Sequence, residues 1–382
     1  MDFYKTFFNS AKYSNKLIWL LIGFISVYSL LLVKSISRET FNYFSVQLLS
    51  VLIGLLGAFF LQAFDYKTLA KFWKWLAAFG IFLIGCTLFA GVKVEGSMGI
   101  NAKAWLRLPG GITFQPSELV KIFFTVTFAH HLAKVKKESN FKNLKDVFLV
   151  ALHAFVPVLL THLQGDDGAA IIFMFTALTM AFIAGVPFRY FTALFVFAAL
   201  CAPVLWNFVL ADYQKKRILT QMNPEADPLN MGYQQIQGML SIGSGGLFGR
   251  GLFNGPRVAN GVVPVQESDF IFAAAGEELG FFGCLLILIL LAFLIFRLGF
   301  VAKNCGDETG ALICFGIIGI IVSQTIFNLG MCLSLLPVMG VTLPFFSVGG
   351  SSASCLYFGI GIAQNVYLNS NKTAPILDFE EE

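Results

Sequence analysis

Charged residues are scarce in this sequence. Only 13% of its 382 residues are Asp, Glu, Lys or Arg, whereas 57% are hydrophobic and 43 are phenylalanine. A soluble chain of this length would be expected to form two or three domains. Here, runs of about 20 apolar residues recur instead, which is the length that crosses a hydrocarbon core of about 30 Å. The composition therefore excludes a soluble enzyme and indicates a polytopic helical membrane protein.

Signatures of several other protein classes are also missing. The seven cysteines form no C-x-x-C pair, which argues against a disulfide framework and a zinc site. The glycine-rich stretch 243–251 has no G-K-[ST] and no βαβ context, which excludes a phosphate-binding loop for nucleotides. The net charge of +4 comes mainly from short loops between apolar stretches and gives no indication of nucleic-acid binding. The histidines are too scattered to predict a metal site: His130, His131, His153 and His162.

The apolar stretches predict an all-α fold with about ten transmembrane helices. No A-x-A-like cleavage site follows the first stretch, so we interpret it as a span and not as a signal peptide. A large loop, about residues 211–270, separates spans seven and eight. We expect an N-terminal tail (1–16), one membrane domain (17–369) and an acidic, disordered C-terminal tail (370–382). The predicted spans are residues 17–33, 44–64, 72–91, 116–134, 147–163, 168–186, 188–210, 271–296, 309–332 and 350–369.

The distribution of Lys and Arg predicts the orientation in the membrane. An even number of spans places both termini on one side, and the tails and short loops on that side hold most of the basic residues that flank spans. The positive-inside rule therefore places both termini in the cytoplasm. Residues 92–115, 211–270 and 333–349 then face outward. Because a 60-residue loop without a function is unusual, we expect the chemistry on the outer side.

The first outward segment ends in "WLRLPGGITFQPSELVK", residues 105–121. Trp105 and its apolar neighbours alternate with Arg107, which suits a segment in the membrane interface. Gln115 and the proline after it mark a helix start. Glu118 and Lys121 follow three residues apart and share one helix face. A structural ion pair and a pair lining a substrate cavity are both consistent with this spacing.

Further carboxylates lie at the ends of apolar spans. Asp166 and Asp167 separate two spans, either as a solvated turn or with one carboxylate in an outer cavity, where His162 is a candidate partner. Asp269 precedes a long apolar run, and Glu277 and Glu278 lie within that run. A carboxylate in a membrane span is expensive and is by default a functional-site hypothesis. For Glu277 and Glu278, support of the bundle or cavity is the favoured role.

Two more outward stretches have unusual composition. "YQQIQGMLSIGSGGLFGRGL", residues 233–252, predicts a short amphipathic helix and a glycine-rich segment of close backbone approach. Arg250 and Arg257 are candidates to bind an anionic head group, since guanidinium pairs with phosphate through two hydrogen bonds. "LLPVMGVTLPFFSVGGSS", residues 335–352, predicts a re-entrant loop packed in protein, because irregular backbone at membrane depth must be buried or line a cavity.

These stretches, together with "DFIFAAAGEELGFFG", occur in an order and spacing that resemble the SEDS family of bacterial cell-wall proteins, the RodA/FtsW/SpoVE type. The resemblance runs from about residue 15 to residue 370. It departs from the family pattern at Val348, where tyrosine is usual, and in the Gln266-Glu267-Ser268 sequence before the aspartate.

The resemblance implies a peptidoglycan glycosyltransferase of the bacterial plasma membrane. Such proteins polymerise lipid II, an undecaprenyl-diphosphate-linked disaccharide pentapeptide, together with a class B penicillin-binding protein and other cell-wall synthesis machinery. It implies that Asp269 is the catalytic residue. In the Q-P-S-E-L-x-K motif it implies cavity roles for Gln115, Ser117, Glu118 and Lys121, and in the G-G-S-S motif for Ser351.

The chemistry follows from the bond that changes. An α-linked donor and a β-1,4-linked product require an inverting displacement, with a base for the acceptor hydroxyl and positive charge for the departing diphosphate. Asp269 is the predicted base. Arg107, Lys121 and Arg250 are candidates for the diphosphate. No cofactor is evident, and a divalent cation would be shared with the phosphates.

Two other functions remain open at this point. A lipid II flippase would need charges near mid-bilayer and an inverted repeat, and no internal repeat is evident. A non-catalytic scaffold for a penicillin-binding protein is the other alternative. Elongation, division and sporulation members share the quoted motifs, and the short N-terminal tail slightly favours a RodA-like elongation member.

Overall fold

The computed structural model describes residues 10–37, 42–95, 101–107, 113–210, 212–227 and 231–373. Both predicted tails lie mainly outside these residues. The long helices are α2 (Lys16–Ile36), α3 (Tyr43–Leu61), α5 (Trp73–Ala90), α6 (Pro116–Ser139), α7 (Leu144–Leu163), α8 (Asp167–Ala184), α9 (Phe188–Val204), α13 (Ile271–Lys303), α14 (Glu308–Cys332) and α15 (Gly350–Thr373). The shorter elements are helices α4 (Tyr66–Lys71), α10 (Asp212–Met222), α11 (Met231–Gly245) and α12 (Pro256–Asn260), and strands β1 (Val92–Glu95), β2 (Asn101–Arg107) and β3 (Thr113–Phe114).

Each of the ten predicted spans corresponds to one of the long helices, so the all-α polytopic fold is confirmed. Eight of the described helices are long and apolar enough to cross a membrane. Helices α6 and α15 are 24 residues each but are more polar than the others. The exact number of membrane crossings therefore stays a prediction. Their polar residues are tolerated because most of both helices is buried among the other helices.

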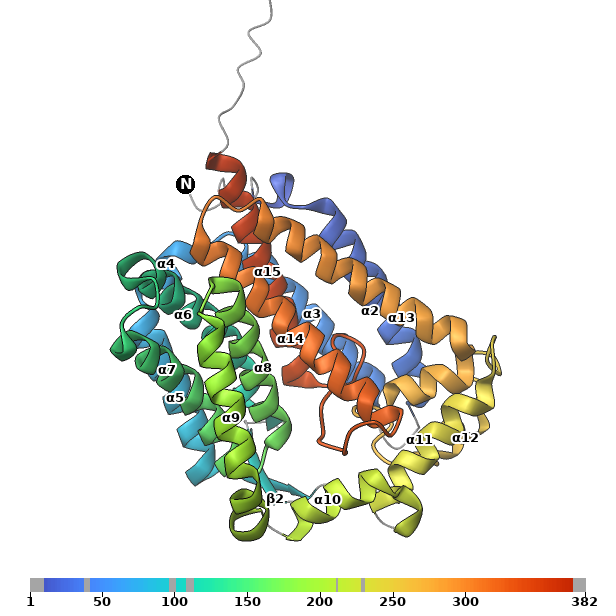
Figure 1. Ribbon diagram of the computed structural model, residues 1–382. Helices are drawn as coiled ribbons and strands as arrows, with labels where there is room; N and C mark the ends of the chain where they lie inside the picture. Colours follow the sequence, from blue (N-terminus) through green and yellow to red (C-terminus); the bar gives the residue numbers. More distant parts are fainter. Residues whose placement is uncertain are drawn as a thin grey trace, which may run out of the picture.

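Helix α14 lies in the middle of the bundle and packs against α6, α8 and α13 (Figure 1). Helix α15 packs along α3, and α2 packs along α13. Helix α9 lies on the outside, where none of its residues is buried. Lipid tails are as apolar as leucine, so a membrane bundle can expose such faces at little cost.

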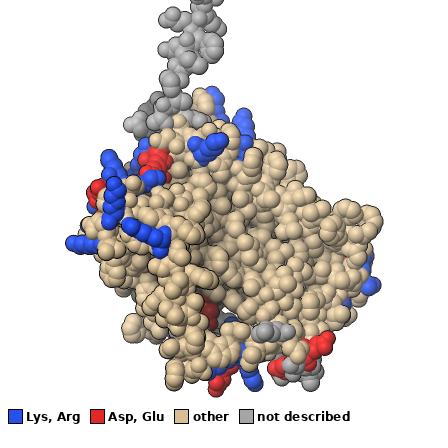
Figure 2. Space-filling view, in the orientation of Figure 1, with Lys and Arg blue, Asp and Glu red and all other residues tan. Residues whose placement is uncertain are grey.

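The start of α2 and the C-terminal part of α15 meet at one end of the bundle. The Asn15 backbone N–H donates to Gln364 Oε1 at 2.9 Å, and Gln364 Nε2 donates to the Asn15 carbonyl at 3.0 Å. Figure 2 shows Lys and Arg side chains gathered over α4 and α6 at this same end. Exposed lysines there include Lys71, Lys137 and Lys142. This arrangement agrees with the predicted cytoplasmic side, and the orientation itself stays a prediction.

The opposite end of the bundle carries more regular structure than the sequence predicted. Strands β1, β2 and β3 form a small antiparallel sheet, so Trp105 and Arg107 lie in a strand. Alternation of apolar and polar side chains is the pattern of a half-buried strand. Within the 211–270 segment, helices α10, α11 and α12 lie across this end (Figure 1). The amphipathic helix predicted within 233–252 is confirmed as α11.

Helix α13 is interrupted at Gly280, whose φ is +65°. The glycine-rich segment after α11 docks into the break: the N–H groups of Arg250 and Gly251 donate to the carbonyls of Glu277 and Glu278. A Cβ at Gly280 would lie 2.3 Å from the Gly249 nitrogen. Only glycine combines this φ with such a close backbone approach. The close approach predicted for this glycine-rich segment is therefore confirmed.

Candidate functional site

A cavity of about 330 Å³ opens at the end of the bundle that carries the sheet. It lies between β2, the N-terminal ends of α6, α8 and α13, helices α10, α11 and α14, and the 338–348 loop. Its ionisable wall residues are Glu118, Lys121, Asp166, Asp167, Arg217 and Asp269. Four carboxylates and two cations therefore converge from four segments that are far apart in the sequence.

Asp269 lies two residues before α13, and several contacts hold its backbone. Asn328 Nδ2 of α14 donates to the Asp269 carbonyl at 2.8 Å and to the Val341 carbonyl at 2.8 Å. The Ser268 hydroxyl donates to Asp269 Oδ1 at 3.0 Å. The other oxygen, Oδ2, faces Gly340, where an added Cβ would lie 3.7 Å away. The carboxylate is thus held at the cavity wall through Oδ1, and Gly340 leaves space beside Oδ2.

The electrostatic environment of Asp269 suits a proton acceptor. Burial raises the pKa of its carboxyl to about 6, and the charge of Glu267 adds to this rise. The hydrogen bond from Ser268 and the charge of Arg217 oppose it. A carboxylate with a pKa near the working pH is the kind of group that acts as a general base. It is about 90% ionised at pH 7 and binds a proton more tightly than an ordinary aspartate.

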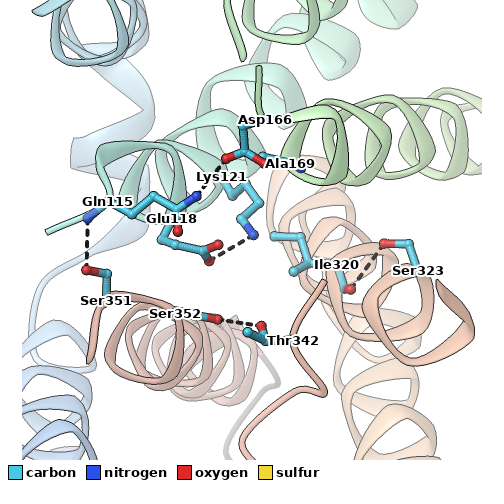
Figure 3. A network of polar contacts seen from close by, with 10 residues as sticks. All are labelled: Gln115, Glu118, Lys121, Asp166, Ala169, Ile320, Ser323, Thr342, Ser351 and Ser352. Carbon is cyan, nitrogen blue, oxygen red and sulfur yellow. Dashed lines mark hydrogen bonds and ion pairs between the residues drawn. The ribbon is translucent and has the colours of Figure 1, made fainter. Parts of the chain in front are cut away.

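Another part of the cavity wall carries a polar network between α6 and α8 (Figure 3). Lys121 Nζ lies 2.8 Å from Glu118 Oε2, and both side chains are at most 9% exposed. Gln115 Nε2 donates to Asp166 Oδ2 at 2.6 Å, and the Ala169 N–H donates to Asp166 Oδ1 at 3.0 Å. Burial raises the pKa of the Asp166 carboxyl. The ion pair expected from the i, i+3 spacing is therefore present, and it borders the cavity.

The structure adds cavity residues that the sequence did not single out. Arg217 of α10 lies within the electrostatic range of Asp269 and lowers the pKa of its carboxyl. Gln324 of α14 is 1% exposed, and its Oε1 has no hydrogen-bond partner among the described residues. Thr342 and Ser352 also line the cavity and share a hydrogen bond of 2.9 Å (Figure 3). Arg217 sits in a lysine-rich stretch of the long loop, and nothing in its local pattern distinguished it.

Several predicted residues lie off the cavity wall. Arg107 and Arg250 are exposed and do not line it. Ser117 is buried behind the wall, with its hydroxyl unpaired among the described residues. Ser351 accepts a hydrogen bond of 3.0 Å from the Gln115 N–H, so it positions the start of α6. The cationic side chains at the cavity are Lys121 and Arg217, and the two arginines expected there are elsewhere.

Glu277 and Glu278 are buried at 0% and 1% exposure, and neither lines the cavity. Glu277 accepts from the N–H groups of Arg257 and Val258 at 2.8 and 3.0 Å, which satisfies the start of α12. Glu278 accepts from the Ser35 hydroxyl at 2.5 Å. These partners agree with a role in supporting the bundle. Arg257, a candidate for head-group binding, instead donates to Ser241 Oγ at 2.9 Å.

Comparison with known proteins identifies the family. The model of a family described as cell cycle protein, the FtsW/RodA/SpoVE family, matches residues 13–372. The chain belongs to this family. It is 31% identical to peptidoglycan glycosyltransferase MrdB of Escherichia coli K12 over 363 residues, covering 95% of each chain. It is 35% identical to stage V sporulation protein E of Bacillus subtilis over 360 residues, covering 92% of this chain and 94% of that protein.

Solved structures agree with this membership of the FtsW/RodA/SpoVE family. A chain from a structure on the coordination of polymerization and crosslinking by a peptidoglycan synthase complex superposes with a TM-score of 0.80 at 28% identity, covering 94% of this chain and 98% of that chain. The rod shape determining protein RodA of Thermus thermophilus superposes with a TM-score of 0.69 at 26% identity, covering 94% and 97%. Similarity of this extent makes the present chain a multi-pass membrane glycosyltransferase.

Proposed function

We propose that this protein polymerises lipid II into β-1,4-linked glycan strands at the outer face of the plasma membrane, with Asp269 as the general base. The observation that carries the proposal is the placement of Asp269. Its carboxyl group has a pKa raised by burial and lines a cavity that Lys121 and Arg217 also line.

The reaction is one displacement at the anomeric carbon of the donor sugar. The acceptor's 4-hydroxyl oxygen attacks that carbon from the face opposite to the diphosphate, and its proton passes to the Asp269 carboxylate. The bond between the anomeric carbon and the diphosphate oxygen breaks, and its electron pair leaves with the diphosphate. Inversion converts the α-linked donor into a β-linked product. General-base assistance of this kind contributes roughly 10²–10⁴-fold.

Lys121 and Arg217 are the cations that would stabilise the departing diphosphate. Both line the cavity with Asp269. Arginine pairs with phosphate oxygens through two parallel hydrogen bonds, and lysine supplies a point charge. Glu118 holds the Lys121 ammonium group in place at 2.8 Å. The Lys121 and Glu118 side chains are at most 9% exposed, and charges held in fixed positions stabilise a developing anion more strongly than mobile, solvated ones do.

A divalent cation is compatible with this mechanism. In the described part of the chain, no three His, Cys, Asp or Glu side chains group together as metal ligands. A cation would therefore be held chiefly by the oxygens of the substrate diphosphate, with cavity carboxylates as additional ligands of the type that Mg²⁺ takes.

The family and the relatives' names support a cell-wall role with a class B penicillin-binding protein as partner. The similar solved chain comes from a peptidoglycan synthase complex that coordinates polymerization and crosslinking, and crosslinking is the reaction that such a partner supplies. Among the possible members we favour an elongation, RodA-like role; a sporulation role is the alternative, because the similarity to stage V sporulation protein E is of the same extent as that to MrdB.

The test is glycan polymerisation from lipid II by the purified protein, with and without an active-site-dead partner. Wild type, Asp269→Asn and Glu225→Gln would be compared; Glu225 is an exposed carboxylate of the same long segment. Long strands from wild type and Glu225→Gln, with at least a 100-fold lower rate for Asp269→Asn, are expected. Equal rates for Asp269→Asn would refute the base. Movement of lipid II across vesicles without polymer would favour a flippase.

A further inference from the structure

A second hollow, the outer groove, lies beside the cavity. It has a volume of about 460 Å³ and is lined by the ends of α5 and α7, the 164–165 turn, β2 and α10. Lys103 of β2 and His162 of α7 are its ionisable lining residues, and both are exposed. In the described part of the chain, the Lys103 ammonium group has no ion-pair partner within 4 Å.

The groove has a rigid base. The Lys103 N–H donates to the Gln164 carbonyl at 2.9 Å, which fixes β2 against the end of α7. Gln164 is 4% exposed, and its Nε2 donates to the Ile84 carbonyl at 2.7 Å and also to Thr87 Oγ1. The backbone of Lys103 is therefore held in place at the groove, and its side chain is exposed there.

One rim of the groove is apolar. Leu88 and Leu163 line it, and Leu163 and the adjacent Phe89 are 60% and 92% exposed at the ends of α7 and α5. Because α5 and α7 are long and apolar enough to cross a membrane, we expect these exposed side chains to face lipid. A cationic floor beside an apolar entrance fits a phosphate group carried by a lipid chain, with the chain remaining in the bilayer.

The outer groove adjoins the cavity, because Gly165 lines both. Asp167, which lines the cavity, stands between them: its Oδ1 lies 2.7 Å from His162 Nδ1, and its Oδ2 accepts from Gln214 Nε2 at 3.0 Å. The Asp167 carboxylate is therefore occupied by groove residues, and this reduces its repulsion of an anion bound at Lys103.

From this arrangement we infer that the outer groove binds the diphosphate of the acceptor lipid II, with Lys103 as its cationic ligand. The inference rests on the proposed function. Glycan polymerisation needs two diphosphate-linked substrates, and only the donor's diphosphate departs. The donor's diphosphate belongs in the cavity with Lys121 and Arg217, near Asp269. In the acceptor, the reacting hydroxyl and the diphosphate are at opposite ends of the disaccharide. With that hydroxyl at Asp269, the acceptor's diphosphate therefore lies outside the cavity, at a neighbouring site.

The kinetic test uses charge reversal. The acceptor diphosphate does not change in the reaction, so its contacts act equally on ground and transition states and affect KM and not kcat. Lys103→Glu is expected to raise the KM for lipid II about tenfold or more with kcat within threefold, and Lys103→Arg to restore it. Lys216→Glu, the same change at an exposed site of α10, is the control and should leave both unchanged. Equal KM values for the two Glu variants would overturn the inference.

A binding measurement keeps this result separate from the proposed function. In the Asp269→Asn background, undecaprenyl diphosphate in nanodiscs should bind at two sites per protein, and Lys103→Glu should leave one. Inorganic pyrophosphate should compete at the lost site, and phosphatidylglycerol should not. Unchanged stoichiometry, or equal competition by phosphatidylglycerol, would overturn the inference even if polymerisation proceeds. Two sites without polymer from wild type would instead count against the proposed function.

Discussion

Replacing Asp269 by asparagine should stabilise this protein while abolishing its activity. In the folded chain the carboxyl group has a pKa raised to about 6 from its ordinary value of 3.8, first because it is buried. A raised carboxyl pKa means that the folded state binds a proton more tightly than the unfolded state. Stability therefore falls as the pH rises from about 4 to about 6, and the penalty is fully present above pH 6. Asparagine is neutral and avoids this penalty.

The size of the effect follows from the pKa. Raising the pKa of one carboxyl from 3.8 to about 6 corresponds to about 3 kcal/mol, at 1.36 kcal/mol per pKa unit. The Ser268 hydroxyl, which donates to Asp269 Oδ1 at 3.0 Å, can donate equally to an amide oxygen. The exchange is nearly isosteric and leaves no new cavity. Little of the gain should therefore be lost to packing.

The assay is unfolding of the purified protein in detergent as a function of pH. Asp269→Asn should match wild type near pH 4 and exceed it increasingly up to pH 7, where the difference levels off at about 3 kcal/mol. Glu225→Gln, an exposed carboxylate, serves as the control and should show no such pH dependence. An Asp269→Asn variant that is no more stable than wild type at pH 7.5 would refute the argument that the ionised Asp269 carboxylate destabilises the folded protein.

Three further predictions concern the cavity and the helix break. The rate of polymerisation should fall as the pH is lowered through an apparent pKa near 6. Because Arg217 lowers the pKa of Asp269, Arg217→Gln should move this fall in rate to higher pH. A pH–rate profile that Arg217→Gln leaves unchanged would exclude the coupling between the two residues. Reversing the charge of Glu118 or Lys121 alone should destabilise the fold by several kcal/mol, because the other charge is left buried and unpaired. Exchanging the two residues for each other should restore folding but not activity. Full activity of the exchanged variant would make the pair purely structural. Gly280→Ala should lower the apparent Tm and destabilise the folded protein by at least about 2 kcal/mol, because an alanine at φ +65° is strained and its Cβ would meet Gly249. An unchanged Tm would show that the helix break at Gly280 can relax.

The sequence by itself determined the membrane architecture. In lipid every backbone N–H and C=O must be paired within the protein, so apolar stretches of sufficient length become helices whatever their neighbours are. The same local logic predicted the start of α6 at Pro116 and the ion pair of Glu118 and Lys121, since spacing along one helix decides both. Asp269 was singled out from a motif, and its place before α13 agreed with the apolar boundary.

Only the tertiary structure decided which polar side chains meet. Arg107 and Arg250 looked as suitable for a diphosphate as Arg217, yet only Arg217 lines the cavity, because α10 lies across its opening. The break at Gly280 depends on a segment more than 25 residues earlier supplying backbone donors. Contacts of this kind join residues far apart in the chain, and no local propensity encodes them. The adjoining outer groove follows from the same packing of β2, α7 and α10.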